Sequence, residues 1–303
     1  MSDIDHALTE DRVLGFSLSS RNVRGRLVRL GPVLNEVLAA HDYPPVIQKL
    51  VAEALVLAAL LGAMLKEDQG QLTLQAQTES GVVSLLVADY KAGEVRGYAK
   101  FDAARLAEVG EEPTLFGLFG KGFLAITFDQ ATTGERYQGV VPLEGAGLGA
   151  AAEHYFAQSE QIPTQVRVGF AKQDGRCIAG GLLLQHLPEG EEGRERLHTK
   201  LDHPEWEHVA ALGATMGADE LADPSLLLES LLWRLFNEED EVRVLAETVL
   251  RRGCRCTLEH IRGVLAEFPH EERLEMADEN GIIGVDCAFC STVFPVSVEE
   301  LAG

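Results

Sequence analysis

The pattern of apolar and polar positions divides the chain into a mixed first part and a helical second part. Residues 46–65 are almost uniformly apolar and rich in Ala and Leu, which predicts a helix buried on most sides. Shorter alternating or β-branched segments between Gly-containing turns predict strands at residues 23–30, 71–77, 82–90, 95–101, 123–129, 166–172 and 178–185. We therefore expect an α+β core domain with antiparallel sheet and packed helices over residues 1–190.

The composition changes near residue 188. Residues 189–200 are charged and nearly free of large apolar side chains, which is typical of a domain boundary. Residues 203–216 and 225–236 have apolar side chains at helical spacings and predict amphipathic helices that must dock on a neighbour. We expect a helical, acidic linker over residues 191–242 and a small C-terminal domain over residues 243–303.

Charge and targeting signals restrict the expected location and partners of the protein. The first twelve residues have neither the basic nor the apolar region of a secretory signal, so we expect a cytoplasmic protein. The longest apolar run, residues 54–65, is shorter than the roughly 20 residues that cross a bilayer, and no membrane partner is expected. Residues 181–303 contain 26 acidic and 10 basic side chains of a chain with net charge −22. Such a surface repels phosphates, so no nucleic-acid partner is expected.

Four of the five cysteines form two close pairs near the end of the chain. Cys254 and Cys256 flank one residue, and Cys287 and Cys290, which follow after 30 intervening residues, flank two. Structural disulfides are rare in a reducing cytosol, so metal binding or redox chemistry is the first hypothesis. Four thiolates around one point suit tetrahedral zinc, and we predict one zinc ion bound by these four residues.

Other ligand sets could occupy this site. His260 or His270 would replace one thiolate, or the four cysteines would bind an iron–sulfur cluster, but four available thiolates favour zinc. Four unrelated buried cysteines are a poor explanation for two pairs so close together. Cys177 has no partner nearby in the sequence and is predicted to be a small core residue.

The segments around the cysteines predict a small metal-binding fold. A turn at residues 280–281, a strand at 282–285 and a returning strand at 292–296 place the second pair in a metal knuckle. Thr257 is predicted to cap a short helix that ends at residue 266, and Pro269 begins an acidic stretch.

The predicted zinc site can react with oxidants at its sulfur ligands. Four thiolates leave no open position on the metal, which argues against hydrolytic catalysis. Each pair is spaced to close a local disulfide, and oxidation removes the electron pairs that hold the ion. Zinc binding contributes on the order of 10–16 kcal/mol in small fingers, comparable to the whole stability of a typical domain. Oxidation is therefore expected to expel zinc and unfold the module.

These features resemble the 33-kDa redox-regulated heat-shock chaperones. The cysteine spacing follows an acidic helical segment and an α+β domain, as in that family. Three further segments agree, namely YFAQSEQIPT at residues 155–164, VRG at 95–97 and LWRLF at 232–236. The likeness extends over essentially the whole chain.

The resemblance implies an ATP-independent holdase that is inactive while reduced and zinc-bound. Oxidation would form disulfides between Cys254 and Cys256 and between Cys287 and Cys290, with the second pair sensing oxidant first. The active form would hold unfolding client proteins as a homodimer. Two alternatives remain, a structural zinc-ribbon interaction module and, less favoured, a dithiol oxidoreductase that uses Cys287 and Cys290 directly.

Two loose nucleotide-binding motifs and one arginine-rich strand have structural explanations. Residues 145–150 match a loose dinucleotide pattern, but no acidic residue follows at the ribose-binding distance, so a turn is predicted. Residues 116–122 do not fit a phosphate loop and are predicted to be a loop. Arg21, Arg24, Arg26 and Arg29 are interpreted as a solvated face paired with local acids, with contact to the acidic linker as the alternative.

Overall fold

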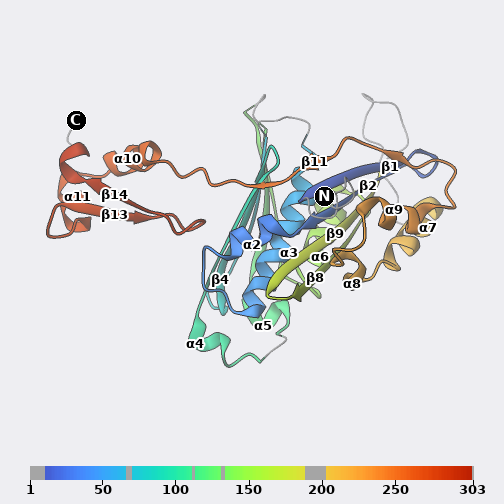
Figure 1. Cartoon of the computed structure of the whole chain (residues 1–303), viewed down its shortest axis with the longest axis horizontal. Coiled ribbons are helices and arrows are strands. Elements are labelled where there is room, and N and C mark those ends of the chain that lie inside the picture. Colours follow the sequence, from blue (N-terminus) through green and yellow to red (C-terminus); the bar gives the residue numbers. More distant parts are fainter. Residues whose placement is uncertain (1–10, 66–69, 111–112, 131–133, 188–202, 302–303) are drawn as a thin grey trace.

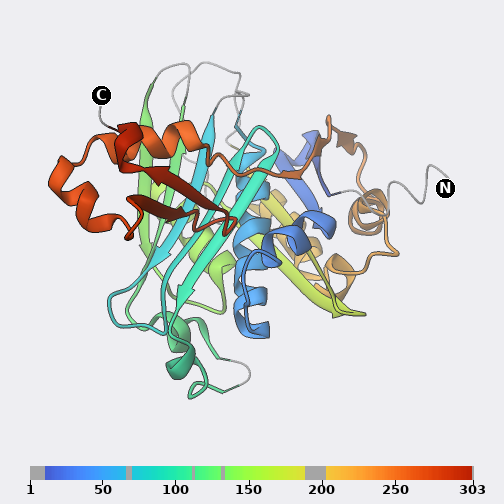
Figure 2. The ribbon, with the colours of Figure 1, turned by 60° about the vertical axis from the view of Figure 1, so that its left-hand side comes forward.

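Two six-stranded sheets enclose one long helix in the computed structural model, which describes residues 11–65, 70–110, 113–130, 134–187 and 203–301 (Figures 1 and 2). Sheet A has the order β10-β1-β2-β9-β8, with β11 also paired to β1. Its strands are β1 (Arg12–Leu18), β2 (Val23–Leu30), β8 (Thr164–Gln173), β9 (Arg176–His186), β10 (Arg243–Val244) and β11 (Thr248–Val249). This architecture confirms the expected α+β class with antiparallel sheet.

Sheet B has the order β12-β5-β4-β3-β6-β7. Its strands are β3 (Gln71–Gln77), β4 (Val83–Lys91), β5 (Glu94–Phe101), β6 (Phe123–Asp129), β7 (Arg136–Pro142) and β12 (Arg251–Arg252). The described pairs in both sheets are antiparallel except for β12 on β5, which is parallel.

Helix α3 (Pro45–Gly62) fills the space between the two sheets and confirms the predicted buried helix. Pro45 stands at its first position, where the missing N–H costs nothing. The helix is long and apolar enough to cross a membrane, but 72% of its most apolar window is buried inside the protein. A Cβ on Gly62 would overlap the Tyr90 ring, so glycine permits the close approach of α3 to β4. This helix is the core helix of the domain.

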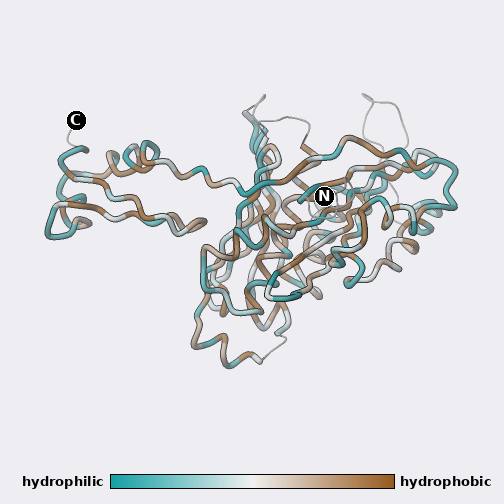
Figure 3. Tube along the Cα trace, in the orientation of Figure 1, coloured by the Kyte–Doolittle hydropathy of each residue, from teal (hydrophilic) through white to brown (hydrophobic). Residues whose placement is uncertain are grey.

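Three helices of the predicted linker cover the outer face of sheet A, where apolar side chains of both layers are buried together (Figures 1 and 3). They are α7 (Pro204–Ala214), α8 (Ala218–Leu221) and α9 (Leu228–Phe236). Paired Gly169 and Gly180 lie under α8, and a Cβ on either would overlap the carbonyl oxygen of Ala218 or Leu221. The absence of side chains at these two positions lets the helix backbone rest directly on the sheet.

Two arginines, one in β1 and one in the turn between β1 and β2, hold the linker helices through acidic partners. Buried Arg12 is bound by Glu229 of α9 at 2.7 and 2.8 Å and by Glu247 at 2.7 Å. Arg21 is bound by Glu205 of α7 and by Glu239 after α9. Each arginine is about 200 residues from its partners in the sequence, so no local pattern predicts these contacts.

The interpretation of the arginine stripe as a solvated face with local acids is wrong. Arg21 pairs with the linker, and the Arg29 guanidinium donates to the Asp223 carbonyl at 2.5 Å. Arg24 donates to Gln185, and burial lowers the pKa of both Arg24 and Arg26. The alternative, contact with the acidic linker, describes Arg21 and Arg29.

Several short elements complete the core domain. They are η1 (Ser19–Arg21), α2 (Pro32–Leu38), α4 (Ala103–Leu106), α5 (Leu115–Phe119), α6 (Leu148–Tyr155) and the π-helical η2 (Phe156–Glu160). The predicted loop at residues 116–122 is wrong for its first part, because Thr114 caps α5 through the amide of Gly117. The sequence patterns also gave no prediction for β1, β7 or α2.

The predicted turn at residues 145–150 is wrong for its second part, because α6 begins at Leu148, and the N-terminus of this helix is already capped. The carboxylate of Glu53, on α3, accepts a hydrogen bond from the Gly149 amide at 3.0 Å. Burial raises the pKa of Glu53, and hydrogen bonds from the amides of Gly149 and Leu148 oppose that rise. An acidic side chain stands where a nucleotide phosphate would bind to the helix end.

The chain between the linker and the cysteines crosses the edges of both sheets. We call this segment, residues 243–253, the strap (Figure 1). Its β10 and β11 extend sheet A along β1, and its β12 extends sheet B along β5. The register shifts by one residue between the Phe16–Val244 and Val13–Thr248 pairs, which indicates a β-bulge in the strap.

Asp11 lies beside the strap and makes stability depend on pH. Its carboxylate, 6% exposed, accepts hydrogen bonds from the amides of Gly31 and Val33, and burial raises its pKa to about 6. A raised folded-state pKa gives stability that is complete below the unfolded pKa and lost as pH rises through about 6, worth about 3 kcal/mol. We therefore expect Asp11→Asn to remove this loss. The check is the difference in unfolding free energy between wild type and variant from pH 4 to 7, and a flat difference would contradict the assignment.

The C-terminal module has its own small core. It contains α10 (Leu258–Ala266), α11 (His270–Met276), β13 (Ile282–Asp286), β14 (Val293–Ser297) and η3 (Val298–Leu301). Thr257 caps α10 through the His260 amide, and β13 and β14 form the predicted hairpin. The buried apolar side chains are Ile261, Leu265, Ile283, Val296, Val298 and Leu301. Hydrophobic positions are interspersed with hydrophilic ones along α10, whereas α11 is mostly hydrophilic (Figure 3).

Candidate metal centre

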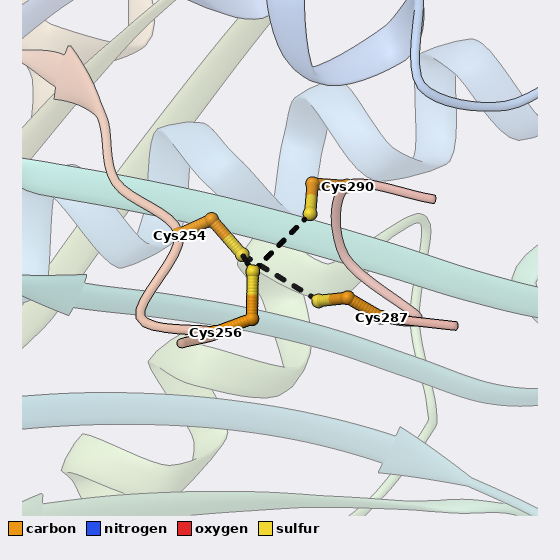
Figure 4. Close-up of side chains that lie close together, drawn as sticks. All are labelled: Cys254, Cys256, Cys287 and Cys290. Atoms are coloured by element: carbon orange, nitrogen blue, oxygen red, sulfur yellow. Dashed lines mark hydrogen bonds between the residues drawn. The ribbon is translucent and has the colours of Figure 1, made fainter. Parts of the chain in front are cut away.

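The two cysteine pairs meet where the strap enters the module. Cys254 and Cys256 lie between β12 and α10, and Cys287 and Cys290 lie in the turn between β13 and β14 (Figure 4). The sulfur of Cys254 is 3.1 Å from that of Cys256 and 3.5 Å from that of Cys287. The sulfurs of Cys256 and Cys290 are 3.4 Å apart. The structure thus brings together all four residues of the predicted site.

This geometry fits a tetrahedral metal ion. The four sulfurs lie within 4.8 Å of one another. Bonds of about 2.3 Å from a central zinc would place sulfurs about 3.8 Å apart, so small adjustments admit the ion. His260 and His270 are exposed and lie outside this group, so the alternatives with a histidine ligand find no support in the described residues. The cluster is able to hold a metal ion with sulfur ligands alone.

The local environment moves the pKa values of Cys256 and Cys290 in opposite directions. Burial, followed by hydrogen bonds with Cys254 and Cys290, raises the pKa of Cys256. Burial also acts to raise the pKa of Cys290, but hydrogen bonds with the Thr292 side chain and backbone outweigh it and lower the pKa to about 6. The Thr292 hydroxyl lies 3.2 Å from the Cys290 sulfur. A lower pKa favours the thiolate, which is the form of cysteine that binds metal and reacts with oxidant.

Residues between the cysteines dock the module on sheet B. The Arg96 guanidinium of β5 lies 4.0 Å from the centre of the Phe289 ring, and it is held from behind by Asp89. Tyr98 meets the same ring edge to face at 6.5 Å. Arg255, between the first two cysteines, donates to the Gln71 side chain of β3 at 2.5 Å. Each cysteine pair therefore has its own contact with the core.

The loop after α2 provides a second point of docking. The Ser291 hydroxyl, next to Cys290, donates to the Ala40 carbonyl at 2.7 Å. The His41 ring lies 5.3 Å from that of Tyr98. These docking residues were not predicted from the sequence. The position of Phe289 and of Arg255 between two paired cysteines was a signal in the sequence, but their partners Arg96, Tyr98 and Gln71 are more than 180 residues away.

We expect Phe289→Ala to loosen the module while leaving its metal ligands intact. The change removes the contact with Arg96, which is worth about 0.5–2 kcal/mol. Amide hydrogen exchange of β5 should rise, and metal release in peroxide should become faster. Val293→Ala, at a residue 62% exposed at the start of β14, is the matched control. Equal exchange in both variants would show that the ring contact does not hold the module.

Cys177 lies apart from the metal centre. It is 3% exposed in β9 and belongs to the main apolar core, as predicted. Burial raises the pKa of its thiol, which makes it unreactive.

The fold and the site define a class of protein, in which a four-thiol metal module is attached to an α+β core carrying docked helices. Comparisons place the chain within that class. The family model described as Hsp33 protein matches residues 11–297. The 33 kDa chaperonin of Caulobacter vibrioides (strain NA1000 / CB15N) is 43% identical over 304 residues, covering 97% of this chain and 98% of the relative.

Two further relatives agree. The 33 kDa chaperonin of Yersinia pestis (strain Pestoides F) is 35% identical over 293 residues and covers 96% of this chain and 94% of its own. The crystal structure of the 33 kDa chaperonin from Thermotoga maritima matches the fold with a TM-score of 0.79, at 24% identity and 96% coverage of both chains. The chain belongs to the Hsp33 family, whose members are redox-regulated chaperones and not enzymes.

Proposed function

We propose that this protein is a holdase whose metal centre is a zinc site and whose thiols form its redox switch. The observation that carries the proposal is the cluster of four sulfurs within 4.8 Å in a module with only six buried apolar residues in its core. Zinc in such a site contributes on the order of 10–16 kcal/mol, which a core of this size does not replace. The reduced, zinc-bound form is the folded and inactive state.

Oxidation would convert the four thiolates of Cys254, Cys256, Cys287 and Cys290 into two disulfides. Each sulfur pair loses two electrons, and each peroxide accepts two electrons and two protons to become two waters, so two peroxides react per chain. Disulfide sulfurs no longer hold the ion, which leaves as Zn²⁺. We infer that Cys287 and Cys290 react first, as the family resemblance implies.

The structure supports a route from the lost metal to a binding surface. The module continues directly into the strap, and the strap continues into α9 and the other linker helices. Unfolding along this route would uncover the outer face of sheet A and the buried faces of the helices. The side chains concerned include Phe16, Leu18, Leu27, Leu182, Leu184, Trp206, Leu231 and Phe236. Contiguous apolar surface of this kind binds unfolding proteins.

We also propose domain boundaries, an oligomeric state and a cellular location. We place the core domain at residues 1–190, the responsive linker at 191–242 and the switch domain at 243–303. The oxidised form would act as a homodimer on unfolding or aggregation-prone clients. A cytoplasmic location suits the mechanism, because the resting protein needs four reduced thiols.

One titration tests the proposed function. Peroxide is added in steps to the zinc-bound protein while released zinc, far-UV circular dichroism and light scattering of a heat-denatured client are followed on the same sample. We expect zinc release, loss of helical signal and client protection to occur together. Protein that loses its zinc but never protects the client would refute the proposal.

A further inference from the structure

The strap is an extended peptide that already occupies one edge of each sheet. It donates to sheet A from the amides of Leu245 and Leu250, to the carbonyls of Gly15 at 2.8 Å and Asp11 at 2.7 Å. It donates to sheet B from the amides of Arg251 and Gly253, to the carbonyls of Gly93 and Val95, both at 3.0 Å. Backbone groups make all four of these bonds.

Most side chains of the strap face solvent, although Glu247 binds buried Arg12 and Arg251 binds Glu94. Val244, Leu245 and Val249 are 51%, 44% and 58% exposed although all three are apolar. Ala246 and Glu247 are also exposed, while Leu250 is buried in the main core. An edge that holds a peptide chiefly through its backbone selects an extended conformation and not a particular sequence.

The strap is also short and interrupted. Its three strands have two residues each, and a bulge separates the first two. The strands that it covers are longer, since β1 has seven residues and β5 has eight. The strap lies along both edges, but its short strands pair with only part of each edge.

We propose that the edges of β1 and β5 are binding sites for extended backbone segments of client proteins, opened when the strap leaves. This inference rests on the proposed function, because release of the strap follows from unfolding of the module that begins at Cys254. Unfolded clients carry unpaired N–H and C=O groups that add to a free sheet edge as an extra strand. Recognition through the backbone suits a protein that must hold clients of unrelated sequence.

The strap's own sequence supplies the probe. A labelled synthetic peptide of residues 241–253 is titrated against the full-length protein, and fluorescence anisotropy reports binding. We expect the oxidised protein to bind it at least tenfold more tightly than the reduced, zinc-bound protein, whose edges are covered. Excess peptide should also lower client protection by the oxidised protein.

Two N-methylated peptides separate backbone pairing from side-chain contact. Methyl groups on the amides of Leu245 and Leu250 block the bonds to Gly15 and Asp11, and binding should fall at least tenfold. Methyl groups on the amides of Val244 and Val249 are the matched control. In the antiparallel pairing the N–H groups of these two residues point away from β1, so this peptide should bind as tightly as the unmethylated one.

The possible results distinguish this inference from the proposed function. If the oxidised protein protects clients but binds both methylated peptides equally, or binds no strap peptide, the edge sites are wrong and the holdase stands. Peptide that splits an oxidised dimer without lowering client protection would assign the edges to the strap of a second copy and overturn the client assignment. If oxidation releases zinc without client protection, the holdase proposal fails and the edge sites fail with it.

Discussion

Gly180→Val should turn the reduced, zinc-bound protein into an active holdase. The valine Cβ would overlap the Leu221 carbonyl oxygen, so α8 is forced off sheet A. Overpacking of this kind costs about 1–3 kcal/mol, which shifts the balance between docked and undocked linker by roughly 5–150-fold. The apolar surface under the linker helices would then be exposed without any oxidation of the cysteines.

The protein contains a built-in reporter for this change. Its two tryptophans, Trp206 and Trp233, both lie on linker helices, and only Trp206 is buried, at 8% exposure. The variant should show red-shifted emission and client protection in reducing buffer while keeping its zinc. Gly284→Ala is the control, because its Cβ enters open space on β13. Unchanged emission with no client protection in the Gly180 variant would show that docking of α8 does not control activity.

Cys256→Ser should unfold the C-terminal module and remove its response to oxidant. Its sulfur lies close to those of Cys254 and Cys290, and three thiolates with a serine hydroxyl form a much weaker zinc site. Losing most of the ~10–16 kcal/mol of metal binding exceeds what the small apolar core supplies. Helical signal from α10 and α11 should disappear, and client protection should no longer depend on peroxide.

Zinc content by mass spectrometry and far-UV circular dichroism test this expectation together. Cys177→Ser is the matched control, since it changes a buried thiol outside the cluster. That control should retain one zinc ion and its peroxide response, with a modest loss of thermal stability. A Cys256 variant that keeps both zinc and the helices would show that the module folds without four thiolates.

The sequence predicted those parts of the structure that local patterns specify. Residues 46–65 were predicted as a buried helix, and α3 follows this prediction because uniform apolarity requires burial on all sides. Strand β1 was not predicted, since α3 and the linker helices bury both of its faces and erase the alternation. The cysteine cluster was predicted because its spacing is local within each pair.

Contacts between segments that are distant in the sequence could not be predicted from local patterns. The partners of Arg12 and Arg21 lie in the linker, and those of Phe289 and Arg255 lie in sheet B. The strap was not predicted either, because its exposed side chains give no alternating pattern and its pairing is made through the backbone. Such contacts depend on the tertiary arrangement, which no single segment encodes.

The two docking residues between the cysteines bear on how sharply the protein responds to oxidant dose. Arg255 contacts sheet B from inside the first pair, and Phe289 does so from inside the second. Closing one disulfide removes two metal ligands and distorts the backbone of one contact, but the other contact still holds its own cysteine pair against sheet B, so the strap of a half-oxidised chain remains attached. Release then requires both events in the same molecule. The dose–response curve should therefore be sigmoidal, with brief or mild exposure to oxidant filtered out.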